Sequence, residues 1–98
     1  MTDIAHYQFF QKLKTHPCVD AVILYGSRAR GDASERSDFD IAIVGDMKVQ
    51  QWQEIQDIID TADTLYPIDL VHYNTLSVDS ELKKNIDEEG CVIYKQSS

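Results

Sequence analysis

Two acidic residues in the middle of the sequence have a spacing suited to binding a metal ion. Asp38 and Asp40 are two residues apart in Ser37–Val44 (SDFDIAIV), a largely apolar segment that predicts a strand. Because side chains alternate along a strand, both carboxylates project from one face, with Phe39 and Ile41 on the other. Adjacent carboxylates on a buried strand lose hydration, and a divalent cation such as Mg²⁺ compensates for that loss.

A third carboxylate, Asp69, lies in another apolar segment, Ile68–Tyr73, which also predicts a strand. Aspartate is depleted inside strands, so a specific role is expected here. If this strand lies beside Ser37–Val44, Asp69 can reach the same site as the other two carboxylates. Three acidic groups could then hold two metal ions, one at an attacking oxygen and one at a phosphate and its leaving group.

A basic, glycine-containing segment lies upstream of these acids. Gly26 and Ser27 directly follow the apolar segment Val19–Tyr25, and a glycine at that point allows the backbone to approach a phosphate closely. Arg28 and Arg30 follow and supply positive charge for the outer phosphates. Together with the downstream acids, this arrangement predicts a site for a metal-bound polyphosphate.

Seven elements are expected to position these residues. In chain order they are a helix from Thr2 to about His16 that Pro17 ends, a strand Val19–Tyr25, a strand Ser37–Val44, a helix from Val49 to Ala62, a strand Ile68–Tyr73, a helix from Thr75 to about Glu89 that Gly90 ends, and an edge strand Cys91–Tyr94. The order predicts an α/β (α+β) fold, a small mixed sheet packed with helices. About a dozen residues join the first two strands, which allows either pairing sense.

The length and composition favour one small domain with an acidic surface. We expect residues 1–98 to form a single domain, with no room for a separate acceptor-binding domain. The net charge of -8 argues against general nucleic-acid binding. No apolar run is long enough for a membrane span, and the N-terminus lacks the pattern of a signal peptide. Two distant cysteines, Cys18 and Cys91, fit reduced thiols in a cytoplasmic protein.

The combined motif resembles the DNA polymerase β-type nucleotidyltransferase superfamily. The matching segments are 25–31 (YGSRARG), 37–41 (SDFDI) and 67–71 (PIDLV), and the tail 88–94 (EEGCVIY) is typical of its small members. The resemblance is greatest to the minimal nucleotidyltransferases, the antitoxins of prokaryotic HEPN/MNT toxin–antitoxin pairs. It implies a nucleotidyltransferase fold.

The resemblance also implies a role for each matching residue. Gly26 and Ser27 would hold the triphosphate of ATP, and Asp38 and Asp40 would bind both Mg²⁺ ions. Asp69 would complete the metal site and help to deprotonate the acceptor hydroxyl. The phosphate role of Arg28 and Arg30 is inferred from their charge and proximity instead, because they lie in the variable part of the motif.

Three functions remain open from the sequence. The leading one is transfer of AMP to a hydroxyl group of a protein. The resemblance implies ATP as the donor and, as the acceptor, an HEPN-type ribonuclease toxin with which the chain would form a hetero-oligomer. The second is an antitoxin that masks its partner by binding alone, since an acidic surface suits a ribonuclease with a basic RNA-binding face. The third is a nucleotidyltransferase for a small molecule, against which the absence of a substrate domain counts.

Overall fold

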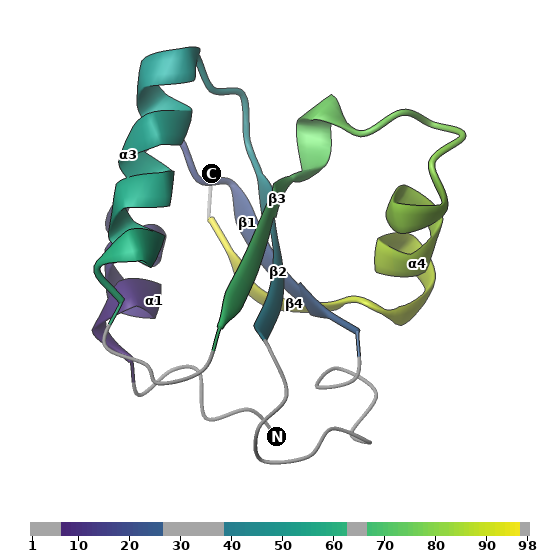
Figure 1. The fold of residues 1–98 in the computed structure, drawn as a ribbon, viewed down its shortest axis with the longest axis horizontal. Helices are drawn as coiled ribbons and strands as arrows, with labels where there is room; N and C mark the ends of the chain where they lie inside the picture. The colour runs from purple at the N-terminus through teal and green to yellow at the C-terminus, as the bar shows by residue number, and fades with distance from the viewer. Residues whose placement is uncertain (1–6, 27–38, 63–66, 97–98) are drawn as a thin grey trace.

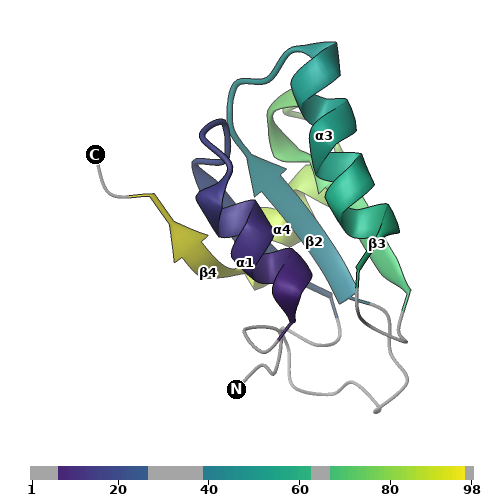
Figure 2. The ribbon, with the colours of Figure 1, turned by 90° about the vertical axis from the view of Figure 1, so that its left-hand side faces the viewer.

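Four strands form one mixed sheet in the part of the chain that the computed structural model describes, residues 7–26, 39–62 and 67–96. The strands are β1 (Ala21–Tyr25), β2 (Phe39–Val44), β3 (Ile68–His72) and β4 (Cys91–Lys95), in the order β3-β2-β1-β4. The helices are α1 (Gln8–Thr15), α3 (Val49–Asp60) and α4 (Glu81–Glu89), with a short 3-10 turn η2 (Tyr73–Thr75) after β3. Helices α1 and α3 cover one face of the sheet and α4 covers the other (Figures 1 and 2).

The pairing of the strands confirms the expected mixed sheet. β1 pairs antiparallel with β2 and with β4, whereas β2 pairs parallel with β3. The parallel pair is connected through α3, as a crossover between parallel strands requires. The sequence left the pairing sense of the first two strands open, and the structure shows it to be antiparallel. β4 lies at the edge of the sheet, as predicted.

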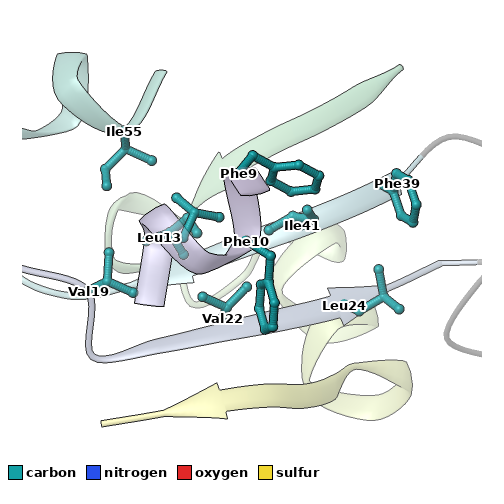
Figure 3. Close-up of a cluster of buried hydrophobic side chains, with 10 residues drawn as sticks. Phe9, Phe10, Leu13, Val19, Val22, Leu24, Phe39, Ile41 and Ile55 are labelled. Atoms are coloured by element: carbon teal, nitrogen blue, oxygen red, sulfur yellow. The ribbon is translucent and has the colours of Figure 1, made fainter. Parts of the chain in front are cut away.

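The main core lies between the sheet and the helices α1 and α3 (Figure 3). It is built from alternate residues of β1 and β2 and from the apolar positions of the helices, so each element buries one face. Its buried side chains are Phe9, Phe10, Leu13, Val19, Val22, Leu24, Phe39, Ile41, Ile43 and Ile55. The described helices include none that is long and apolar enough to cross a membrane.

A smaller cluster joins the other face of the sheet to α4. Ile86 of α4 is buried against Tyr25 and Ala42. A polar network between α4 and the segment after β3 fixes the position of the helix: the hydroxyl of Tyr73 donates to Asp87 at 2.5 Å, and the ammonium group of Lys83 lies 3.1 Å from that hydroxyl. The helix is therefore attached to the sheet by apolar contacts and by hydrogen bonds to the segment after β3.

Gly90 ends α4 where the chain passes closely over β1. Its backbone is extended (φ -69°), and its N–H donates to the carbonyl of Ile86 at 2.8 Å. A Cβ atom here would overlap that carbonyl oxygen and lie 2.6 Å from Cγ2 of Ile23. The predicted helix stop at Gly90 is correct, and its cause is this close approach, with no left-handed backbone involved.

Two predicted helices begin later in the structure. Tyr7 is extended, so α1 begins at Gln8, and the predicted cap Thr2 lies outside the described residues. The Tyr7 ring packs against Phe9 and Phe39, and these aromatic contacts favour the extended backbone of Tyr7 over a helical one.

The predicted helix from Thr75 was wrong over its first turns. The hydroxyl of Thr75 donates to the carbonyl of His72, and Leu76 is extended, so the 3-10 turn ends there. α4 then begins after Ser80, whose side chain accepts a hydrogen bond from the backbone N–H of Lys83. A serine that satisfies a free N–H group at a helix start competes with helical structure upstream.

Candidate active site

Three residues on adjacent strands form a polar row across the α4 side of the sheet. Tyr25 of β1 is the register partner of Asp40 of β2, and Asp40 is the register partner of Asp69 of β3. Register partners project from the same face, so Tyr25, Asp40 and Asp69 lie side by side. Phe39 and Ile41 face the core on the opposite side, as the alternation predicted.

The row becomes more exposed from β1 toward the edge strand β3. Tyr25 is buried, with 6% of its surface exposed, Asp40 is half-buried and Asp69 is exposed. The next row inward on this face is apolar, since Ile23, Ala42 and Val71 belong to the cluster under α4. The two carboxylates therefore lie at the boundary between a packed interior and solvent, where an ion could reach them.

Gly26 brings the backbone directly against the carboxylate of Asp40. A Cβ atom at Gly26 would overlap Oδ2 of Asp40, and the φ angle of +77° is in the left-handed region that favours glycine. A backbone that passes this close to a carboxylate can present its atoms to a ligand bound there. The structure thus brings Gly26 together with two of the predicted acids.

The environment of Tyr25 keeps its hydroxyl protonated. Burial, together with the negative charges of Asp69 and Asp40, raises the pKa of Tyr25 to about 12. The phenol is therefore neutral across the physiological range and can donate a hydrogen bond. The strand pattern alone marked Tyr25 as the last residue of the apolar segment Val19–Tyr25. Its place beside the acids follows from the antiparallel register of β1 and β2, which the sequence did not fix.

The chemistry of the acidic pair fits Mg²⁺, which prefers hard oxygen ligands and is often held by one or two carboxylates plus substrate phosphate. Asp40 and Asp69 supply such oxygens from adjacent strands. Within the described residues, histidine, cysteine and acidic side chains form no group of three or more that could hold a metal. The third predicted ligand, Asp38, lies outside those residues, as do Ser27, Arg28 and Arg30.

Two residues of interest lie on the α3 side of the sheet: His72, at the far end of β3, and Trp52 of α3. The ring of His72 stacks on Trp52 with centroids 4.9 Å apart, and its Nε2 donates to the carbonyl of Gly45 at 2.6 Å. Trp52 also packs against the core, as predicted. These contacts give both rings a structural role away from the acidic pair.

Solved structures with a similar fold include toxin–antitoxin complexes. A toxin–antitoxin crystallised with AMP-PNP matches with a TM-score of 0.62 and 21% identity, over 90% of this chain and 72% of that one. A mutant of the MntA–HpeT toxin–antitoxin matches with a TM-score of 0.64 and 21% identity, over 98% and 75%. A candidate nucleotidyltransferase of Sulfolobus solfataricus matches with a TM-score of 0.57 and 21% identity, over 91% and 76%. At these identities the likeness shows the fold.

Sequence comparison shows the family. A candidate protein adenylyltransferase of Methanocaldococcus jannaschii is 35% identical over 92 residues, which cover 85% of this chain and 86% of that protein. The family model described as polymerase beta, nucleotidyltransferase, matches residues 8–98. This match includes the Gly26 turn and all of the strands that carry the polar row, and the chain belongs to the polymerase β-type nucleotidyltransferase family.

Proposed function

We propose that this protein transfers AMP from ATP to a hydroxyl group of a partner protein, and that the partner is an HEPN-type ribonuclease toxin which the transfer inactivates. The observation that carries the proposal is the register of Asp40 and Asp69 on adjacent strands, with Gly26 in contact with Asp40. The name of the M. jannaschii relative and the toxin–antitoxin structures support a protein as the acceptor.

Each residue of the site would have a defined task. Gly26 and Ser27 would hold the triphosphate, with Arg28 and Arg30 beside its outer phosphates. Asp38, Asp40 and Asp69 would hold divalent cations. When bound, these cations would neutralise negative charge at the phosphate and at the leaving group. We propose a two-metal site of this kind with Mg²⁺ as the natural ion.

The reaction is a displacement at the α-phosphorus of ATP. The acceptor oxygen forms the new bond to phosphorus, the bond to the bridging oxygen of the β-phosphate breaks, and pyrophosphate leaves. The proton of the acceptor hydroxyl passes to a carboxylate. Asp69 is suited to receive it, because it is the exposed member of the row, where an acceptor from solvent arrives. Holding both reactants in line supplies much of the rate enhancement.

The test is intact-mass spectrometry of a candidate HEPN-type acceptor after incubation with this protein, ATP and Mg²⁺. We expect mass increases of whole AMP units with the wild-type protein and none with Asp40→Asn or Asp69→Asn. Asp46→Asn is the matched control, since it makes the same chemical change at an exposed residue just beyond the opposite end of β2. This control should transfer AMP at the wild-type rate.

The outcome also decides whether the antitoxin acts by AMP transfer or by masking its partner. A stable complex with no mass increase, together with full neutralisation of the toxin by Asp40→Asn, would refute AMP transfer and favour masking by binding. Modification of a small molecule in place of a protein would refute the choice of acceptor while retaining the reaction.

A further inference from the structure

The ring and the hydroxyl of Tyr25 lie in different environments. Its ring is buried between the sheet and α4, where it packs with Ala42 and Ile86. The polar end of the side chain belongs to the row that Tyr25 forms with Asp40 and Asp69, the two carboxylates at the boundary with solvent. The residue as a whole is 6% exposed.

The register of the strands places the Tyr25 side chain beside the carboxylates. Tyr25 is directly opposite Asp40 on β2, and Asp69 follows Asp40 in the same row on β3. Directly opposite residues on adjacent strands project from one face, with Cβ atoms about 4.5–5.5 Å apart. The Tyr25 side chain therefore lies on the same side of the sheet as both carboxylates and beside that of Asp40.

A buried phenylalanine would fill the same space without a polar atom. Tyrosine at this position adds one hydrogen-bond donor, held rigidly by the packing of its ring against Ile86 and located next to Gly26 and the two acids. A neutral donor beside two anions suits a ligand that is rich in oxygen and carries a cation with it. Donors held in place in this way need no reorganisation when such a ligand arrives.

We propose that Tyr25 is a ligand-binding residue of the active site, whose hydroxyl donates a hydrogen bond to an oxygen of the metal–nucleotide complex held between Gly26, Asp40 and Asp69. This inference rests on the proposed function, because it takes the nucleotide and the metal ion from it. The oxygen belongs either to a phosphate group or to a water molecule bound to the metal ion. Both accept a hydrogen bond from a neutral phenol.

The experiment compares the wild-type protein with Tyr25→Phe, which keeps the ring and removes only the hydroxyl. Binding of Mn²⁺ is measured by isothermal titration calorimetry in two arms, with Mn²⁺ alone and with Mn²⁺ plus the ATP analogue AMP-PNP. We expect affinity to fall about tenfold in at least one arm, as for a lost hydrogen bond to a charged ligand. A loss in both arms assigns the oxygen to water on the metal ion, and a loss only with AMP-PNP assigns it to a phosphate.

Tyr94→Phe is the matched control. Tyr94 is a partly buried tyrosine of the same sheet, and it packs with the core on the α1 side of the molecule. Its variant should bind as the wild-type protein does. Thermal unfolding of both variants in buffer without metal checks that each is folded. If Tyr25→Phe is the variant that unfolds, Tyr25→Met, which also keeps an apolar side chain, replaces it in both arms.

The readout needs no acceptor, so its failure can be distinguished from failure of the proposed function. Equal affinities of the wild-type protein and Tyr25→Phe in both arms would overturn this inference and leave the proposed function standing. Absence of binding to the wild-type protein in both arms would overturn the two together. Binding that Tyr25→Phe weakens, with no AMP transfer to any protein, would support this inference alone.

Discussion

Substitution of Gly26 by alanine should damage the site more than it damages the fold. Gly26 has a φ angle of +77°, and a non-glycine residue in the left-handed region costs about 1–2 kcal/mol. The new Cβ atom would also overlap Oδ2 of Asp40, which is the end of a side chain and can rotate away. We therefore expect a stability loss of about 1–2 kcal/mol, which lowers the Tm by about 5–15 °C in a chain of this size.

The rotation of Asp40 is the expected cause of the loss of function. A carboxylate moved by about 1 Å no longer holds its ligand in line for reaction, and misplacements of this size cost about 100-fold in rate. Stability is measured by urea unfolding followed through the fluorescence of Trp52, the single tryptophan, which is stacked on His72. Binding of Mn²⁺ with AMP-PNP and the rate of AMP transfer are measured on the same variants.

Asparagine at position 26 separates the two effects. Asparagine tolerates the left-handed region better than alanine does, but it carries the same Cβ atom. Gly26→Asn should recover part of the lost stability while binding Mn²⁺ and AMP-PNP as weakly as Gly26→Ala. Recovery of ligand binding together with stability would refute the reasoning, because the overlap with Asp40 would then not be the cause of the functional loss.

Three further perturbations test the structure. Gly90→Ala should lower the free energy of unfolding by about 1–3 kcal/mol, measured in urea, because the new Cβ atom meets Cγ2 of Ile23 and the backbone oxygen of Ile86, which cannot rotate away. A change within about 0.5 kcal/mol would contradict the close approach. Tyr25 should make stability depend on pH, because the folded state retains the phenolic proton to about pH 12 and the unfolded state only to about pH 10. The free energy of unfolding is therefore unaffected below about pH 10 and falls by about 3 kcal/mol between about pH 10 and about pH 12. Tyr25→Phe should remove this fall in stability in metal-free buffer. Identical profiles of stability against pH for the two proteins would contradict the role of Tyr25. Ser80→Ala removes a helix cap and should cost about 1 kcal/mol, read from the Tm, whereas an unchanged Tm would show that α4 begins independently of this side chain.

The elements that carry the site could be predicted from the sequence because each has a strong local pattern. The apolar segments around Leu24, Ile41 and Val71 became strands whose described ends lie within two residues of the predicted ones. The helix over Val49 to Ala62 also followed its apolar period closely. Asp69 was placed beside Asp40 only on the condition that their strands pair, and the structure meets that condition.

What the sequence left undetermined depends on contacts between distant residues. The antiparallel sense of β1 and β2 is a property of the assembled sheet, and with it came the position of Tyr25 beside Asp40. Aromatic packing took Tyr7 out of the predicted first helix. At Thr75 the helical pattern was weak, and a hydroxyl bond to the preceding turn prevailed over it. The metal and nucleotide roles of the site stay predictions that the experiments above test.

The exposure gradient along the polar row has a kinetic consequence for the proposed transfer. A molecule that enters from the β3 edge meets the exposed Asp69 before it reaches Asp40 and Gly26. A bulky protein acceptor seated over Asp69 would close that path behind it. ATP must then bind before the acceptor and pyrophosphate must wait for the modified protein to depart. Initial-rate measurements should therefore show a compulsory order, in which a non-reactive acceptor inhibits uncompetitively with respect to ATP.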